Sequence, residues 1–304
     1  VNPCAEILLG NKSFCNLSEV DLFKFKDDSG GLDRALFLAG RANYRQTLVN
    51  LDDGILQRTW HENNEYLRLC GVGLTGIATR EDLNSYDYKR FKNLAIHGAY
   101  SMADELGTQR PKNVTTIKPS GTLSKIMDTT EGCHKPMGKY IFNNVNFSIN
   151  DPMLPKLREA GYHVVLNPTD EHNAIVTFPV AWENIRFDKE GDLYVNKESA
   201  IEQLTRYKLL MDSYVEQNCS ITVSYKEDEV PAIRDWLKSN WSSYVGVSFL
   251  PITNTTYDYL PQEVVTEARY KEYVAQLTDV DFSDTDSTHE IENDECESGV
   301  CPVK

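Results

Sequence analysis

Apolar residues recur at helical spacing over three long stretches of the chain. The stretches cover residues 32–51, 86–106 and 199–217, and within each the apolar side chains fall three or four positions apart. This spacing is typical of amphipathic helices that bury one face. We therefore expect three long helices packed against a core.

Shorter apolar or β-branched runs lie between these helices and predict strands. They cover residues 114–117, 162–166, 174–178, 221–225 and 244–251, and a short helix is expected over residues 152–160. The last two strands flank a helical pattern at residues 230–237, and a strand, helix and strand in succession describe a right-handed parallel crossover. The chain is therefore predicted to belong to the α/β class.

An apolar run at residues 66–76 carries glycines at positions 71, 73 and 76. A glycine loop for a nucleotide would need a G-x-G-x-x-G pattern with an acidic residue at the expected distance, and the run lacks both. We interpret the glycines as positions where the backbone packs closely.

The charge balance argues against nucleic acid as a partner. The 304 residues include 46 acidic and 31 basic ones, a net charge of −15, and no basic cluster is interleaved with aromatic residues. No apolar run approaches the roughly 20 residues needed to cross a bilayer, and the chain does not open with a secretion signal. We expect a globular, cytoplasmic protein that is not bound to a membrane.

Seven cysteines are spread thinly over the chain, and an odd number at this density argues against a secreted disulfide framework. Cys133 and His134 are adjacent and could ligate a metal, but no companion pair stands at metal-site spacing. We predict reduced thiols, a few of them redox-active, and no metal site. Cys219 is interpreted as structural.

The first residues place a cysteine two positions from a carboxylate, in the block Asn2-Pro3-Cys4-Ala5-Glu6. Proline and the following apolar residues 7–9 suggest a rigid loop that enters a strand and carries a reactive sulfur. Cys15 follows eleven positions after Cys4, near enough for the two sulfurs to approach. The competing interpretation is that both cysteines are buried small apolar residues.

A turn of small residues follows the strand at 114–117 and is expected to open a helix. The turn consists of Pro119, Ser120, Gly121, Thr122, Leu123 and Ser124. Free backbone amides and hydroxyls at such a turn form a phosphate cradle without requiring lysine. An ordinary helix N-cap would explain the same residues.

The composition changes abruptly after residue 277. Residues 278–297 contain nine acidic residues and no lysine or arginine, so like-charge repulsion predicts an extended tail. Cys296 and Cys301 lie near its end, with Gly299 between them, and could close a small disulfide ring. We divide the chain into a domain at residues 1–277 and a flexible tail at residues 278–304.

These motifs together resemble the ribonucleotide reductases. The finger loop of that family reads Asn-Pro-Cys-x-Glu, followed by a second cysteine before Asn-Leu, and the matching residues here are Asn2, Pro3, Cys4, Glu6, Cys15, Asn16 and Leu17. Residues 119–124 resemble the substrate-phosphate loop of the adenosylcobalamin-dependent (class II) members. Tails with a Cys-x4-Cys pair occur in the same family.

The resemblance implies a fold, a cofactor and a set of partners. The fold would be the second half of a ten-stranded α/β barrel with a central finger loop, and the cofactor would be adenosylcobalamin. The substrate would be a ribonucleotide, a triphosphate in the monomeric members, and a thioredoxin-like protein would supply electrons. The chain looks like the C-terminal part of a longer protein, so its N-terminal half would be a further partner.

The resemblance also implies residue roles. Cys4 would become a transient thiyl radical that takes the 3′ hydrogen of the ribose, with Glu6 as general base for the 3′ hydroxyl. Asn2 would orient the sugar. Cys15, paired with a cysteine of the upstream half, would supply two electrons, and the pair at 296 and 301 would restore them.

Two alternatives remain at this point. One is the large subunit of a class I reductase, which typically relays its radical through two adjacent tyrosines late in the chain; no Tyr-Tyr dipeptide occurs here. The other is a split or inactive fragment that binds its N-terminal half. We expect the 304 residues alone to be inactive.

Overall fold

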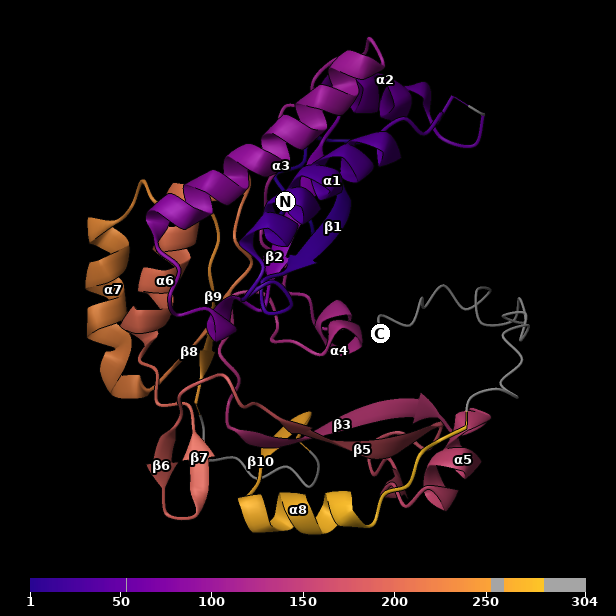
Figure 1. Cartoon of the computed structure of the whole chain (residues 1–304), viewed down its shortest axis with the longest axis vertical. Coiled ribbons are helices and arrows are strands. Elements are labelled where there is room, and N and C mark those ends of the chain that lie inside the picture. Colours follow the sequence, from indigo (N-terminus) through magenta and orange to yellow (C-terminus); the bar gives the residue numbers. More distant parts are fainter. Residues whose placement is uncertain (53, 253–259, 282–304) are drawn as a thin grey trace. The chain divides into compact units, whose positions relative to one another are not determined.

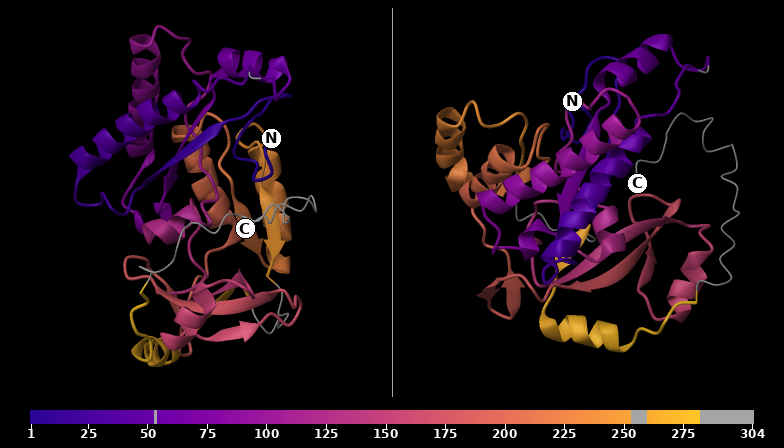
Figure 2. Two further views of the ribbon diagram at one scale, coloured as in Figure 1. Left: turned by 90° about the vertical axis from the view of Figure 1, so that its right-hand side faces the viewer. Right: turned by 45° about the horizontal axis from the view of Figure 1, so that its top comes forward.

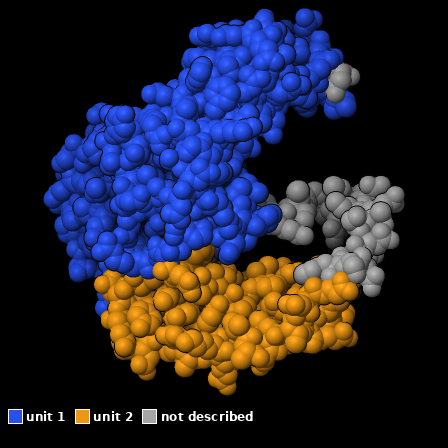
Figure 3. Space-filling model, viewed as in Figure 1, with its two compact units in different colours: residues 1–136, 184–186, 196–256 blue, residues 137–183, 187–195, 257–304 orange. Residues whose placement is uncertain are grey.

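The computed structural model describes residues 1–52, 54–252 and 260–281, which fall into two compact units (Figure 3). Unit 1 comprises Val1–Pro136, Asn184–Arg186 and Asn196–Thr256, and unit 2 comprises Met137–Glu183, Phe187–Val195 and Tyr257–Lys304. Within the described ranges, no helix combines the length and the apolar character that crossing a bilayer would require.

Unit 1 alternates strands with helices (Figure 1). Its elements are β1 (Asn16–Asp21), α1 (Ser29–Gln46), α2 (Arg58–Leu67), β2 (Cys70–Thr75), η1 (Ile77–Thr79), α3 (Ser85–Glu105), α4 (Leu123–Met127), α6 (Ala200–Ser213), β8 (Thr222–Tyr225), η2 (Glu227–Glu229), α7 (Val230–Ser239) and β9 (Ser248–Pro251).

The strands of unit 1 pair in parallel and in the order of the sequence. β1 pairs with β2, and β8 pairs with β9. Between them, Val72 bridges to Thr115 and Ile117 bridges to Cys219, both in parallel. Helices lie in each connection, so unit 1 has the predicted α/β character. The predicted parallel crossover at residues 221–251 is confirmed, and its right hand stays a prediction. Closure into a ten-stranded barrel stays a prediction.

Two of the long helices begin at capping boxes. Asn84 and Asp87 form a capping box at the start of α3, and Ser199 and Glu202 form another at the start of α6. α1 and α3 lie side by side in both Figure 1 and Figure 2. A Cβ at Gly40 or Gly98 would collide with a backbone carbonyl of the facing helix, so glycine permits this close approach.

Unit 2 is built on an antiparallel sheet with the strand order β10-β3-β5-β4. Its elements are β3 (Tyr140–Ser148), α5 (Met153–Glu159), β4 (Val164–Leu166), β5 (Asn173–Ala181), the hairpin β6 (Asp188–Glu190) and β7 (Leu193–Val195), β10 (Gln262–Val264) and α8 (Glu267–Ala275). Aromatic side chains, Tyr140, Phe142 and Tyr273 among them, pack into one of its small cores.

Several local predictions were wrong. Residues 7–9 form no strand, because the Leu8 amide donates to the Gln217 side chain instead of to a neighbouring strand. α2 and β3 were not predicted, whereas helix α5 and strands β4 and β5 were.

Candidate functional site

The N-terminal block forms a tight loop fixed by its own hydrogen bonds. The Ala5 amide donates to the Asn2 carbonyl at 2.9 Å, and the Ile7 amide donates to Asn2 Oδ1 at 3.1 Å. Ala5 has a φ of 61°, in the left-handed region that costs energy for residues other than glycine. The loop geometry therefore has to be held by its surroundings.

Residues more than 100 positions later in the sequence hold the carbonyls of this loop. Ser220 Oγ donates to the Cys4 carbonyl at 2.7 Å, and Asn218 Nδ2 donates to the Ala5 carbonyl at 2.8 Å. The Glu6 carbonyl accepts from the Asn218 amide at 3.1 Å and from Thr116 Oγ1 at 2.8 Å. Three consecutive carbonyls are thus fixed, which leaves the Cys4 side chain as the group presented by a rigid backbone.

Cys4 and Glu6 differ sharply in exposure. Cys4 is exposed, whereas Glu6 is only 3% exposed and its Oε2 has no hydrogen-bond partner among the described residues. Partial burial and the neighbouring Glu6 carboxylate raise the pKa of the Cys4 thiol above its usual value, and Lys118 lowers it. Because a raised pKa keeps the sulfur protonated at neutral pH, the site favours chemistry of an S–H bond over attack by a thiolate.

Cys15 belongs to the same site. Burial raises the pKa of the Cys15 thiol to about 12. A hydrogen bond from Gln217 opposes this rise, and the negative charge of Glu6 adds to it. Gln217 Nε2 lies 3.7 Å from the Cys15 sulfur and 2.7 Å from the Cys70 carbonyl. Since the Glu6 carboxylate acts on both thiols, the structure brings Cys4, Glu6 and Cys15 together.

The turn at residues 119–124 only partly matches the predicted cradle. Gly121 and Thr122 are exposed and Thr122 makes no side-chain cap, so the N-cap interpretation is not supported. Ser120 is buried at a φ of 59°, and its hydroxyl donates to the Glu19 carboxylate. Ser124 is also buried. Leu123 begins α4, so the turn presents its backbone at positions 121 and 122.

Sequence reasoning missed Lys118 and Glu19. Lys118 Nζ lies 3.8 Å from Glu19 Oε2, and its charge also lowers the pKa of Cys4, so it links the turn to the N-terminal loop. Glu19 and Asp21 alternate along β1 and therefore share a face. Acidic residues at alternating positions of a partly buried strand were the available signal.

Glu19 provides a pH-dependent test of this cluster. Burial raises the pKa of Glu19, opposed by the Ser120 hydroxyl and by Lys118. The folded state therefore holds the proton more tightly than the unfolded state, whose pKa is about 4.3, and the stability that Glu19 contributes is lost as pH rises above that value.

Glu19→Gln keeps an acceptor for Ser120 but cannot ionise. We expect the variant to gain stability relative to the native protein as pH rises from about 4 to 7, measured by urea unfolding. Equal pH dependence of the two proteins would show that Glu19 is not forced toward its neutral form.

The remaining predicted positions do not belong to the group formed by Cys4, Glu6, Cys15 and the turn at residues 119–124. Residues Cys296 and Cys301 lie outside the described residues. Among those that the structure does describe, no three His, Cys, Asp or Glu side chains are grouped as a metal site would require. His134 instead accepts the Thr222 amide at Nε2, at 3.1 Å.

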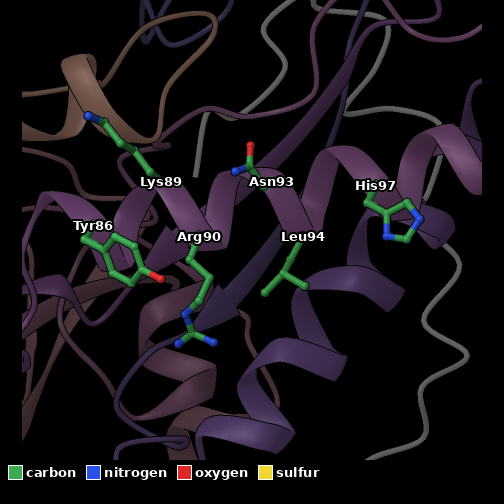
Figure 4. A pocket seen from close by; sticks show the side chains of 6 residues that line it. All are labelled: Tyr86, Lys89, Arg90, Asn93, Leu94 and His97. Carbon is green, nitrogen blue, oxygen red and sulfur yellow. The ribbon is translucent and has the colours of Figure 1, made fainter.

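A separate hollow of about 520 Å³ lies along α3 (Figure 4). Its lining consists of Tyr86, Lys89, Arg90, Asn93, Leu94 and His97, none of which belongs to the Cys4 site. Arg90 forms an ion pair with Asp33 of α1, so the positive charge of this lining residue is already balanced by a carboxylate.

Comparisons with known proteins agree with the motifs. No family model matches the chain. It is 27% identical over 344 residues to an adenosylcobalamin-dependent ribonucleoside-triphosphate reductase of Lactobacillus acidophilus, and 26% identical over 338 residues to one of Levilactobacillus brevis. Each match covers 100% of this chain and 45% of the relative, so the chain spans about half the length of these curated relatives.

Solved structures share the fold. A B12-dependent class II ribonucleotide reductase matches 91% of this chain and 42% of its own, with a TM-score of 0.79 and 22% identity. The α subunit of a class Id ribonucleotide reductase from Actinobacillus ureae matches 82% of this chain and 52% of its own, with a TM-score of 0.52 and 14% identity. The chain is therefore similar over its whole length to adenosylcobalamin-dependent ribonucleoside-triphosphate reductases, and the similarity spans 45% of each of these relatives.

Proposed function

We propose that the complete protein reduces ribonucleoside triphosphates to 2′-deoxyribonucleotides with adenosylcobalamin as cofactor, and that this chain supplies the reacting cysteine. The observation that carries the proposal is the exposed Cys4 thiol on a rigid loop beside the buried, unpartnered Glu6 carboxylate oxygen. The names of the curated relatives support the cofactor and the substrate.

Cys4 and Glu6 divide the first chemical step between them. Homolysis of the cobalt–carbon bond is the chemistry that the cofactor supplies when bound. Cys4, as a thiyl radical, takes the 3′ hydrogen of the ribose, and Glu6 accepts the proton of the 3′ hydroxyl. The free Oε2 of Glu6 suits this role, since no described group of the chain already occupies it. A protonated Cys4 supplies the hydrogen atom that must be removed first.

Asn2 and Cys15 complete the proposed reaction site. The Oδ1 of Asn2 already accepts the Ile7 amide, so its NH₂ group is the part that would donate to a sugar hydroxyl. Cys15 would supply two electrons together with a cysteine of the upstream half and form a disulfide at each turnover. Gln217 holds the Cys15 sulfur in place for that exchange.

The substrate phosphates would lie on the turn at residues 119–124. The exposed amides at Gly121 and Thr122 are the donors we assign, and Lys118 adds a cation near the same turn. Ser120 would act indirectly, by fixing the turn to Glu19. Leu123 and Ser124 would support the turn from α4.

Cys296 and Cys301 would carry electrons from a thioredoxin-like protein to the buried Cys15 disulfide, because a bulky reductant cannot enter a site shielded from solvent. The chain alone would be inactive, since half of the protein and one redox cysteine come from elsewhere. The class I alternative is less favoured, because its representative shares less of the fold.

The test is an assay of the complete protein with adenosylcobalamin and ribonucleoside triphosphates. With dithiothreitol as reductant, we expect deoxyribonucleotide to form in the native protein and in a variant with Cys296→Ser and Cys301→Ser. With thioredoxin as reductant, we expect only the native protein to cycle. Absence of product in every case would overturn the proposed reaction, and thioredoxin-driven cycling of the variant would overturn the shuttle.

A further inference from the structure

Two cysteines outside the proposed reaction site form a close buried pair. The sulfurs of Cys133 and Cys219 lie 3.7 Å apart, and both residues are 0% exposed. Both are free thiols. A separation of 3.7 Å is van der Waals contact, so a modest movement would bring the sulfurs to bonding distance, which is about 2.05 Å in a disulfide.

The chain segments that carry the two cysteines are joined at further points. The Cys133 thiol donates to the Ser220 carbonyl at 3.6 Å, and the Thr222 amide donates to His134 Nε2 at 3.1 Å. Arg206 Nε donates to the Cys133 carbonyl at 2.7 Å. The pair is thus held in register and is not a chance contact of two loose side chains.

The surroundings make the two sulfurs unequal. A hydrogen bond from Cys219, with His134 and Arg206 nearby, lowers the pKa of Cys133, whereas burial raises the pKa of Cys219. Cys133 therefore gives up its proton more readily than Cys219. A more acidic thiol beside a second thiol is the arrangement that reacts with a peroxide and is then resolved by its neighbour.

We propose that Cys133 and Cys219 form a redox-active thiol pair that a small hydroperoxide converts to a disulfide. The Cys133 sulfur attacks the outer oxygen of the hydroperoxide, the O–O bond breaks, and the alcohol leaves with a proton while Cys133 becomes a sulfenic acid. The Cys219 sulfur then attacks the Cys133 sulfur, the S–S bond forms, and water leaves with the Cys219 proton. Two thiols and one hydroperoxide thus give one disulfide, one alcohol and one water.

The disulfide would alter the loop that presents Cys4. Cys219 lies between Asn218 and Ser220, whose side chains hold the carbonyls of Ala5 and Cys4. Closing the sulfurs by more than 1 Å requires movement of the backbone or side chain at 133 or 219. Because the neighbours of Cys219 are the anchors of the loop, the oxidised pair would shift Cys4.

Tryptic peptides provide a direct test in the complete, reduced protein. Hydrogen peroxide is the probe, followed by alkylation in denaturant, digestion and mass spectrometry. Cys133 lies in the peptide of residues 126–139 and Cys219 in that of residues 209–226, and neither peptide contains another cysteine. We expect the two peptides to be recovered as one disulfide-linked product, whose mass is the sum of the two reduced peptides less two hydrogen atoms. The yield of this product should approach one per chain. Recovery of both peptides unlinked would overturn the proposal.

Two matched comparisons separate this pair from the proposed reductase chemistry. The link is expected to persist when Cys4, Cys15, Cys296 and Cys301 are all replaced by serine, so it does not depend on turnover. In the otherwise native protein, peroxide is expected to change the rate at which Cys4 is alkylated, and Cys133→Ala or Cys219→Ala is expected to remove that change. An unchanged alkylation rate in the linked protein would overturn the coupling to the loop.

Discussion

Replacing Cys4 with serine in the complete protein is expected to abolish ribonucleotide reduction and the exchange of hydrogen between solvent and the 5′ carbon of adenosylcobalamin. Serine holds its hydroxyl hydrogen much more strongly than cysteine holds its thiol hydrogen, so it cannot replace the thiol as a radical carrier. The loop itself should be preserved, because Ser220 binds the carbonyl of residue 4 and not its side chain. At this exposed position we expect a change in stability within about 0.5 kcal/mol.

Cys15→Ser is the matched comparison for Cys4→Ser. It replaces a thiol of the same site, but one that we assign to electron supply and not to the radical. The Cys15 variant is therefore expected to retain hydrogen exchange with the cofactor and to lose multiple turnover. Tritium exchange and product formation measure the two effects separately. Persistent exchange in the Cys4 variant would remove Cys4 from its proposed role.

The sequence allowed the long helices of unit 1, α1, α3 and α6, to be predicted because their signals are local. Asn84 and Asp87 lie within one turn of the start of α3, and the apolar period then continues for the length of the helix. The fully buried β2, in which glycines 71 and 73 face close neighbours, confirms the interpretation of that run as tightly packed backbone. Local periodicity was sufficient at these places.

The same reasoning failed at residues 7–9, where a short apolar run does not distinguish a strand from a buried loop. Ile7 is buried, but the next amide is satisfied by the Gln217 side chain. The antiparallel sheet of unit 2 was also not anticipated, because β10 pairs with β3 across more than 100 residues of sequence. Pairings of that kind leave no local pattern.

The candidate site likewise contains residues that a local motif predicts and residues that only the fold reveals. Cys4, Glu6 and Cys15 were predicted from a motif that fits within fifteen residues, and the structure brings them together. The residues that hold the loop, Asn218 and Ser220, lie in an unremarkable stretch of sequence and were not predicted as part of the site. A motif identifies the reacting groups, whereas the fold determines which distant polar residues hold them.

Asn218→Leu is expected to produce the second large effect, a loss of stability of about 3 kcal/mol together with loss of reductase activity. Asn218 is 0% exposed, donates to the Ala5 carbonyl at 2.8 Å and to the Gly246 carbonyl at 3.2 Å, and accepts the Tyr207 hydroxyl at 2.8 Å. Leucine is similar in size but makes no hydrogen bond. The buried Tyr207 hydroxyl and two partly buried carbonyls would therefore lose a partner at once.

The exposed Asn93 of α3 provides the matched control, since its side chain anchors no loop among the described residues, and the same change to leucine there is expected to alter stability by less than about 0.5 kcal/mol. Urea and thermal unfolding of the complete protein measure the difference between the two variants. Because Ala5 holds its left-handed backbone only under restraint, release of its carbonyl should also let the loop relax and move Cys4 away from Glu6. An Asn218→Leu protein with native stability and native activity would show that the hydrogen bonds of this side chain do not determine where Cys4 lies.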